Sequence, residues 1–513
     1  MKKEEVIEYL KEHELVRQNA AAAFIACDLA FVSYLDFRIS SKSYFSPHFS
    51  YMSHNHSHIW YQITSRRLIK EVSGKIYHAY LKNPKNIKGM IENHKNLISK
   101  TDNIWKRYKL LCKKGISDND FLKIFKDFVV VSKKWWKYAV IGEDKYSLVY
   151  SKTVKNFQEK HNLSKAKAHE FTQLLSHPKE ESLFVSERRD FLGVSLYASE
   201  NKGIKKSLLD EQVGDALRDN ALKKKIEAYI KKYFWIRTNF YTASKVTPLS
   251  LLKDVKNKVS ENSTFIIRNE LKKVDYNLKK FRIKQNEITS RLKLSGSDKT
   301  DMRFAQISAY WIDQRKVGMM KNFYYFFSML RDMAKRFNMD YDTLTLYTLE
   351  EAEKLLKNRK KVDKRKISKR SKNLFIVYEK NKGMTFFYGN DAKKLFEVSK
   401  HAKHKDKLKG MVASRTKSRL IKGIARIVSD PSKEKFHKNE ILVTSMTRVE
   451  FVPVMRNAKA IITDEGGITS HAAIVSRELS IPCIVGTKHA THTLKNGMTV
   501  EMDMNTGTIR VLK

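Results

Sequence analysis

The stretch that decides the fold of the C-terminal part of the chain is Thr463-Asp-Glu-Gly-Gly-Ile-Thr-Ser-His-Ala-Ala-Ile-Val-Ser-Arg-Glu-Leu-Ser-Ile-Pro-Cys-Ile-Val-Gly-Thr487. Its pattern predicts a strand, a Gly-Gly loop, a helix and a second strand. Gly466 and Gly467 allow the backbone a positive φ and keep side chains away from an approaching ligand. The stretch therefore predicts a loop that brings backbone close to a bound group.

The helix that follows the loop begins near His471. Thr469 or Ser470 can cap this helix, which places His471 in its first turn, where free N–H groups favour an anionic phosphate. A neutral imidazole at such a position suits a phosphoryl acceptor, because the loop can stabilise the roughly two negative charges that arrive. Arg477, six positions later, could return a guanidinium to the same region. By spacing alone, however, a histidine at a helix start is more often a surface or capping residue.

The sequence around this loop predicts a compact α/β domain of about 100 residues, a normal domain size. Short β-branched runs alternate there with turn residues and two helical pieces. The predicted strands are Gly423–Val428, Ile441–Thr444, Ala460–Thr463, Pro482–Val485, Thr499–Met502 and Thr508–Leu512, and the predicted helices are Arg448–Arg456 and Ser470–Leu479.

The run Gly466-Gly-Ile-Thr-Ser-His-Ala-Ala-Ile-Val-Ser-Arg477 closely resembles the phosphohistidine signature of the swivelling, or mobile, domain of phosphoenolpyruvate-utilising enzymes. That group includes phosphoenolpyruvate synthase, pyruvate phosphate dikinase, enzyme I of the sugar phosphotransferase system and rifampin phosphotransferase. The resemblance continues in family order through Gly423, Thr447, Pro453, Ile481–Thr487, Leu494–Gly497, Asp503 and Gly507.

This resemblance implies a three-layer β/β/α domain that swings between distant active sites. It implies that His471 carries the phosphoryl group and that Arg477 meets this group when the domain docks. Thr469 matches the threonine beside the family histidine, which is a regulatory phosphorylation site in some plant members.

The rest of the chain is predicted to be mostly helical, since 7 prolines and 18 glycines in 513 residues leave few turns. Helical periodicity marks Val6–Leu35, Phe121–Tyr138, Lys165–Leu175, Leu217–Tyr233, Ile283–Leu292 and Trp311–Phe337. A last short helix, Leu349–Leu356, has Thr348 as its predicted cap. Two strands, Asn373–Tyr378 and Met384–Tyr388, predict a hairpin.

These patterns predict an α+β multidomain protein with a large, mostly α-helical N-terminal region and a C-terminal β/β/α swivelling phosphohistidine domain. The predicted parts are a helical domain (1–356), a basic linker (357–372), a short hairpin or connector (373–409) and the mobile domain (410–513). The linker, rich in Lys and Arg, is interpreted as a solvated segment or an exposed helix end.

The full enzymes of the family add an ATP-grasp domain or a phosphoenolpyruvate-binding barrel, and neither is expected here. No G-x-G-x-x-G or G-x-x-x-x-G-K-[ST] motif precedes Gly410, and only 26 residues follow Thr487. We expect no cofactor or metal on this chain, and we expect ATP and Mg²⁺ on a partner ATP-grasp or phosphoenolpyruvate synthase-like kinase subunit.

The N-terminal region resembles, more loosely, the helical middle domain of rifampin phosphotransferase, which holds the acceptor substrate. Lys231–Asn239, Asp313–Met320 and Leu349–Leu356 carry this resemblance. The chain is then interpreted as a phosphotransferase component, similar to pyruvate,water dikinase or rifampin phosphotransferase. It would carry phosphoryl from a separate ATP or phosphoenolpyruvate site to an unidentified small-molecule acceptor. The alternative is a basic module that binds nucleic acid or protein, in which the swivelling domain is structural or regulatory.

The formal net charge is +46, from 101 Lys and Arg against 55 Asp and Glu, and +39 of it lies in residues 1–410. This excess predicts weak, non-specific binding of polyanions. A solvated lysine-rich surface and a dedicated nucleic-acid surface both remain open. Three separated cysteines exclude a disulfide framework, and no segment has the length or leader pattern of a membrane span or signal peptide. The sequence therefore predicts a soluble, cytoplasmic protein that does not bind membranes.

Other candidate residues have two interpretations each. His54-Asn-His-Ser-His58, with His48 nearby, is either a metal site or a polar loop. The run Trp135-Trp136-Lys137-Tyr138 either stacks on bases or packs in a core, and Tyr233, Phe234 and Trp235 either line an acceptor pocket or pack in a core. His489 and His492 are expected on the domain surface.

Overall fold

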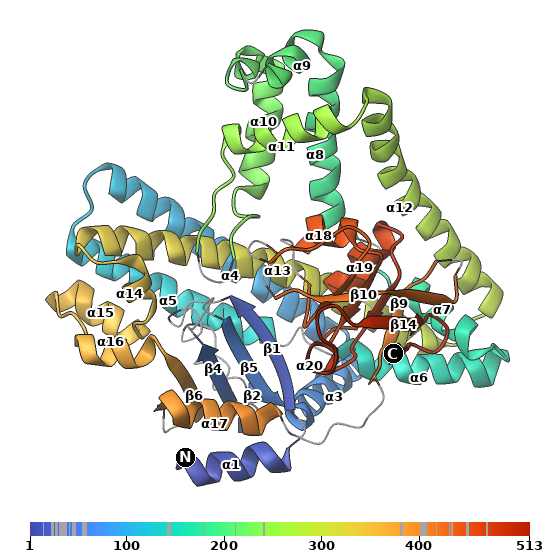
Figure 1. Ribbon diagram of the computed structural model, residues 1–513, viewed down its shortest axis with the longest axis horizontal. Coiled ribbons are helices and arrows are strands. Elements are labelled where there is room, and N and C mark those ends of the chain that lie inside the picture. The colour runs from blue at the N-terminus through green and yellow to red at the C-terminus, as the bar shows by residue number, and fades with distance from the viewer. Residues whose placement is uncertain are drawn as a thin grey trace. The chain divides into compact units, whose positions relative to one another are not determined.

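The computed structural model describes all of the chain except residues 14, 22–24, 26–28, 30–37, 40–41, 44–47, 54–58, 141–144, 179, 211, 240–241, 380–382, 401–407, 417, 430, 432–433, 448–450, 468–469 and 513. The chain forms two compact units (Figure 1). The first comprises residues 1–151, 239–242 and 325–513, and the second comprises residues 152–238 and 243–324.

An antiparallel five-stranded sheet joins distant parts of the first unit, in the order β1-β5-β4-β6-β7. Its strands are β1 (Leu15–Ala21), β4 (His48–Ser53), β5 (Ile59–Ser65), β6 (Asn373–Glu379) and β7 (Gly383–Tyr388). A separate pair is formed by β2 (Arg38–Ile39) and β3 (Lys42–Ser43). Figure 1 shows α1 (Lys3–Glu12) and α17 (Gly389–Lys400) next to the five-stranded sheet.

The core beside this sheet mixes residues from the two ends of its sequence. It contains Val6, Leu10, Phe375, Val377, Ala392, Leu395 and Phe396. All seven residues of β6 are buried, because this strand lies between β4 and β7.

Two predictions are corrected by this sheet. The helix predicted over Val6–Leu35 ends at Glu12, and β1 follows it because it pairs with β5 along its whole length. Residues 373–409 are not a connector, because β6 pairs with β4 from His48 opposite Tyr378 to Ser53 opposite Asn373. Pairing across more than 300 residues leaves no trace in local periodicity. The compact units accordingly differ from the division at residues 356, 372 and 409.

The remaining elements of the first unit before residue 400 are helices. They are α3 (Arg66–Lys82), α4 (Lys85–Lys113), α5 (Asp118–Val140), α14 (Tyr341–Thr345), α15 (Leu349–Asn358) and α16 (Lys364–Arg370). The predicted cap is confirmed, since the Thr348 hydroxyl accepts the Glu351 N–H at 3.2 Å. Trp135 and Trp136 in α5 are buried, which confirms their interpretation as core residues.

The described elements of the second unit are helical. They are α7 (Lys165–Leu175), α8 (Leu183–Glu200), α9 (Lys202–Leu209), η1 (Asp215–Arg218), α10 (Asn220–Tyr233), α11 (Pro248–Glu261) and α12 (Thr264–Leu292), while α6 (Lys145–His161) and α13 (Gly296–Arg336) contribute residues to both units. Tyr233 and Trp235 are buried, so the core interpretation of these two side chains is confirmed.

The C-terminal part of the chain forms an eight-stranded sheet in the order β8-β15-β14-β10-β11-β12-β13-β9, of which β10 to β13 run parallel. The strands are β8 (Leu408–Lys409), β9 (Met411–Ser414), β10 (Leu420–Ile427), β11 (Ile441–Thr444), β12 (Ala460–Thr463), β13 (Cys483–Val485), β14 (Thr499–Asp503) and β15 (Thr508–Val511). The helices are α18 (Val452–Asn457), α19 (His471–Glu478) and α20 (Ala490–Thr493). All six predicted strands and both predicted helices are present, with shifted ends.

The fold is thus a large helical N-terminal region followed by a strand-rich C-terminal domain, as predicted. Among the described helices, none combines the length and apolarity that crossing a bilayer requires.

Candidate functional site

The predicted phosphohistidine loop lies where the parallel strands of the C-terminal sheet end. The Asp464 N–H donates to the Thr444 carbonyl at 3.1 Å, and the Thr487 N–H donates to the Thr463 carbonyl at 3.0 Å. These bonds hold the segments after β11, β12 and β13 together at one edge. In sheets of parallel strands this is the edge at which ligands bind.

The loop delivers the chain into α19 with His471 as the first helical residue. Ser470 is the N-cap, and its hydroxyl accepts the Ala473 N–H at 3.3 Å. The structure therefore has one of the two predicted caps, while Thr469 lies outside the described residues. The N–H groups of His471 and Ala472 have no acceptor within the helix, and the positive end of the helix dipole is here. This first turn suits an anion.

Two glycines make the loop possible, and only one of them was predicted as a site residue. Gly466 has a φ of 108°, and a Cβ there would lie 2.8 Å from both the Cβ and the hydroxyl oxygen of Ser470. Gly486, which follows β13, has a φ of 72°, and a Cβ there would lie 2.9 Å from the Gly466 carbonyl oxygen. Either side chain would push the loop away from the helix cap.

Gly467 differs from the prediction that both loop glycines use a positive φ. It is not among the glycines with positive φ, and a Cβ there would meet nothing within 4 Å. Its carbonyl accepts the Ser470 N–H at 2.9 Å. Its contribution is a turn and open space beside the helix start.

Asp464 anchors the loop and was missed by sequence reasoning. Its side chain is buried and accepts the Thr491 N–H at 3.1 Å and the Thr487 hydroxyl at 3.2 Å, and the Thr491 hydroxyl also donates to it. Burial raises the pKa of Asp464, and these hydrogen bonds oppose the rise. A signal was present, since an acidic residue directly after a fully apolar strand is unusual in a core.

Arg477 lies on the same helix as His471 but on another side of it. Six positions correspond to about 240° of helical rotation. The Arg477 Nε donates to the Ala473 carbonyl at 2.8 Å, so the half-buried guanidinium group lies along its own helix. The expected return of this group toward the start of α19 is not what the structure has.

Cys483 lies beside this helix and is not a competing nucleophile. It is fully buried in β13, and burial raises the pKa of its thiol to about 12, while a hydrogen bond from Ser476 opposes the rise. The thiol therefore stays protonated near neutral pH, and the residue acts in packing.

The first unit also contains a hollow of about 540 Å³ near the end of α13. It is lined by Thr242, Arg331, Ala334, Lys335, Asn338, Met339 and Tyr341. The Arg331 guanidinium lies 5.9 Å from the centre of the Tyr341 ring and donates to the Thr242 hydroxyl. Neither Arg331 nor Lys335 makes an ion pair with a described residue, so the hollow has cations beside an apolar floor.

The other sequence candidates are not gathered at the loop. The segment His54–His58 lies outside the described residues, and His48 is in β4. In the part of the chain that the structure describes, no group of three or more His, Cys, Asp or Glu could hold a metal ion. His489, expected on the surface, is half-buried as the N-cap residue of α20, and His492 lies within that helix.

Asp313 belongs to a segment that was compared with acceptor-binding domains. Its carboxylate is buried and accepts the Leu183 N–H, at the first residue of α8, at 2.9 Å. Burial raises the pKa of Asp313, and the bond from Leu183 opposes the rise. Its observed contact is therefore a tie between α13 and the start of α8.

Comparison with known proteins identifies the C-terminal domain. Residues 436–507 match the family described as PEP-utilising enzyme, mobile domain. The probable phosphoenolpyruvate synthase of Staphylothermus marinus is 54% identical over 90 residues, which are 17% of this chain and 11% of that protein. The probable phosphoenolpyruvate synthase of Archaeoglobus fulgidus is 47% identical over 114 residues (22% and 15%), and the phosphoenolpyruvate synthase of Pyrococcus furiosus is 56% identical over 84 residues (16% and 10%).

These matches have a narrow range. They span 10–15% of the length of the three relatives, so the likeness covers the mobile domain and not the whole of either protein. Among solved structures, that of Thermococcus kodakaraensis aconitase X in its holo-form matches 21% of this chain with 21% identity and a TM-score of 0.17, which is too low to carry an argument.

Proposed function

We propose that this chain is the phosphoryl-carrying component of a phosphotransferase and that His471 is the carrier. An imidazole nitrogen of His471 attacks the phosphorus of the donor, so an N–P bond forms as the donor's P–O bond breaks. An acceptor hydroxyl oxygen then attacks the same phosphorus. The N–P bond breaks, the imidazole regains its electron pair, and the hydroxyl proton is released.

One observation supports this proposal most. His471 begins a helix at the carboxyl edge of parallel strands, within residues that match the mobile domain of PEP-utilising enzymes. The N-terminus of α19 offers backbone N–H groups to the phosphoryl oxygens without placing a side-chain cation in the resting loop. The positive φ of Gly466 keeps that helix end open.

The donor belongs to another site in this proposal. We infer a separate ATP-grasp or phosphoenolpyruvate site on a partner subunit, which would also hold ATP and Mg²⁺. The proposal places the chain in the cytoplasm, because Cys112 and Cys483 are both free thiols, as a reducing compartment requires.

The acceptor is inferred to be a small hydroxylated molecule held on the helical region. The hollow at Arg331, Lys335 and Tyr341 is a candidate place, because two cations and an apolar floor suit a ligand with an anionic group and a ring. In the same proposal Arg477 turns from the Ala473 carbonyl to the phosphoryl group when the domain docks, and Thr469 supports the loop.

The test is phosphoryl transfer to the purified full-length chain. With ATP and Mg²⁺ alone, the chain should stay unlabelled, and with an added ATP-grasp kinase domain it should gain an acid-labile, base-stable label. His471→Ala should abolish the label. His489→Ala is the matched control, since it removes another histidine at a helix start in the same domain, and it should leave labelling unchanged.

Two further variants grade the site. Arg477→Ala should slow transfer about 10-fold or more while leaving the fold intact, because it removes one charge-assisted contact to the transition state. Thr469→Val should slow transfer less, because it removes only a hydroxyl. An acid-stable label on Thr469 or Ser470 would instead make the loop a regulatory site, and labelling by ATP without a partner would reveal a kinase site on this chain.

A further inference from the structure

The basic segment, residues 357–372, is a part of the chain that the carrier function does not use. It contains ten Lys and Arg residues and one acidic residue, Asp363. The sequence predicts a solvated linker or an exposed helix end, and the structure corrects this. The segment completes α15, turns through a short loop, forms α16 and leads directly into β6.

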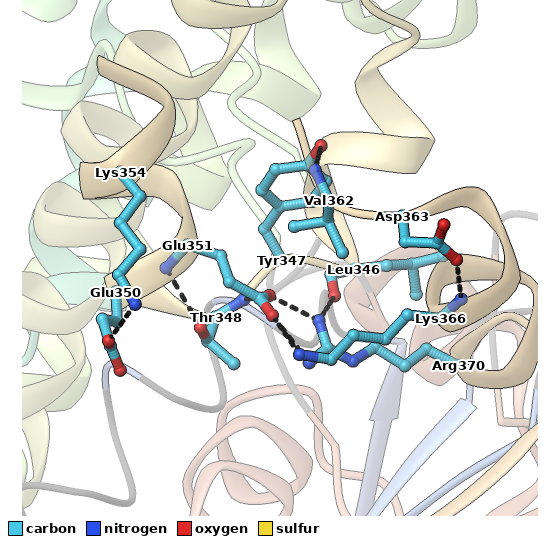
Figure 2. A network of polar contacts seen from close by, with 10 residues as sticks. All are labelled: Leu346, Tyr347, Thr348, Glu350, Glu351, Lys354, Val362, Asp363, Lys366 and Arg370. Carbon is cyan, nitrogen blue, oxygen red and sulfur yellow. Dashed lines mark hydrogen bonds and ion pairs between the residues drawn. The ribbon is translucent and has the colours of Figure 1, made fainter. Parts of the chain in front are cut away.

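One carboxylate holds the basic segment in place (Figure 2). Arg370 is 1% exposed, and its two terminal nitrogens donate to the two oxygens of Glu351 at 2.6 and 3.1 Å. Arg370 also donates to the Leu346 carbonyl at 2.9 Å. The Lys366 ammonium donates to the same Glu351 carboxylate at 2.7 Å. Glu351 therefore neutralises two cations of the segment on the inner side of α16.

Backbone contacts fix the loop before α16. The Asp363 carboxylate caps the helix by accepting the Arg365 and Lys366 N–H groups at 2.7 and 3.3 Å. The Val362 N–H donates to the Tyr347 hydroxyl at 2.9 Å, as Figure 2 also shows. The path of the loop is thus set by contacts that leave its lysine side chains unused.

Seven cations of the segment remain on the surface. Arg359 pairs with Asp118 at 2.6 Å, in addition to the two cations on Glu351. The remaining seven are exposed and make no ion pair with any residue that the structure describes. They are Lys357, Lys360, Lys361, Lys364, Arg365, Lys369 and Lys372.

The cations on α16 divide by face. At 100° per residue, Lys364, Arg365 and Lys369 fall within about 140° of the helix circumference. Lys366 and Arg370 fall on the opposite side, where Glu351 lies. The sequence order therefore places one set of cations inward on a carboxylate and another set outward on the solvent.

Such a run of like charges is normally disordered, because the charges repel one another. Here the fold orders it, so the seven surface cations are held in place before any partner arrives. A partner that neutralises them gains electrostatic free energy with little further ordering cost. The cations spread over a surface and do not converge on a point, which suits an extended polyanion better than one phosphate group.

We propose that the basic segment binds the phosphodiester backbone of a nucleic-acid duplex without reading its sequence. A duplex has one negative charge per about 1.7 Å of axis, so several phosphates lie along the roughly 10 Å length of α16. None of the exposed side chains in the segment is a large apolar or aromatic group. Insertion into a bilayer and stacking on single-stranded bases would need such groups, so backbone contacts fit best. This inference stands apart from the carrier function.

The test is fluorescence anisotropy with a labelled RNA or DNA duplex of about 20 base pairs, using the full chain between 50 and 200 mM salt. The test variant is the triple Lys364→Gln, Arg365→Gln, Lys369→Gln. Its matched control is Lys223→Gln, Lys224→Gln, Lys231→Gln on α10, which removes the same charge from exposed lysines that make no printed ion pair. Neither triple removes a contact of the fold, so both proteins should melt as the parent does.

The test triple should weaken binding at least about 10-fold at 100 mM salt and reduce the slope of log K against log salt by about 3. The control triple should change binding less than about threefold, and a duplex of scrambled sequence should bind equally. Equal losses in the two triples would overturn the proposal in favour of diffuse attraction, as would no binding by the parent at 50 mM salt. Tighter binding to phosphatidylserine vesicles than to the duplex would overturn it in favour of a membrane surface.

Discussion

The loop before α19 and the basic segment both prepare the protein to meet negative charge, and they do so by different means. At α19 the attraction comes from backbone N–H groups, and the residues that shape it, Gly466 and Ser470, are uncharged. In the basic segment the attraction comes from ten cationic side chains. The first arrangement focuses on one point and the second covers a surface.

This difference teaches what each kind of site requires from the fold. A helix N-terminus needs only a cap and room for the backbone, so a short motif can specify it. A run of lysines and arginines repels itself, so it needs an internal counter-charge before it can be ordered. Glu351 supplies that counter-charge from α15, on a neighbouring helix.

The largest expected effect comes from removing that counter-charge. Glu351→Ala leaves the buried Arg370 without its carboxylate, which costs about 3–5 kcal/mol for a buried pair. The basic segment should then open, and tryptic cleavage at its ten basic residues should become rapid by mass spectrometry. Glu350→Ala is the control, because Glu350 is exposed and pairs only with the exposed Lys354.

If the Glu350 and Glu351 variants were cleaved equally slowly, the segment would be held by something other than the carboxylate. If both parent and variants were cleaved at once, the segment would be the solvated linker that its sequence suggests. Either result would remove the contrast between the two regions.

The two regions also differ in how far sequence alone could describe them. The strand, loop, helix and cap around His471 are local features, and all of them followed from residues within a stretch of 25. The glycine at positive φ followed as well, although Gly467 does not share it. Asp464 was missed because its partners, Thr487 and Thr491, are more than 20 residues away.

The order of the basic segment could not be predicted, for the same physical reason. Arg370 meets Glu351 only because α15, the loop and α16 fold back on one another. The strands at 15–65 were hidden because their partners include β6, more than 300 residues later in the sequence. Composition describes the average surroundings of a residue, and these contacts depend on a single long-range neighbour.

The next effect tests the backbone site with a pair of neighbouring glycines. Gly466→Ala forces a side chain to a φ of 108° and places its Cβ 2.8 Å from Ser470, so it should destabilise the C-terminal domain by about 2–3 kcal/mol and lower phosphoryl transfer at least 10-fold. Gly467→Ala meets open space and should change stability by less than about 1 kcal/mol. Thermal unfolding and the labelling assay measure both. Equal effects would mean that the loop, and not the cap, limits the site.

The smallest effect is a difference in pH response between the two regions. Burial would raise the pKa of Glu351, but the hydrogen bonds from Arg370 and Lys366 outweigh it and lower that pKa from 4.5 to about 2. A lowered carboxyl pKa stabilises the fold above the unfolded value and loses this contribution as pH falls toward the folded value. The basic segment should therefore loosen between about pH 4.5 and pH 2, by about 1 kcal/mol at pH 3.5.

The loop before α19 should respond with the opposite sign. Burial raises the pKa of Asp464, so its contribution to stability is present at low pH and is lost as pH rises through the folded value. Hydrogen exchange at pH 6 and pH 3.5, corrected for intrinsic rates, should show loss of protection in α16 and none in α19. Glu351→Gln has no carboxyl group to titrate, so α16 in that variant should lose no further protection on acidification. Equal acid-induced loss in parent and variant would assign the pH response to other carboxylates, and parallel loss in α16 and α19 would mean that the two regions do not differ as their pKa shifts require.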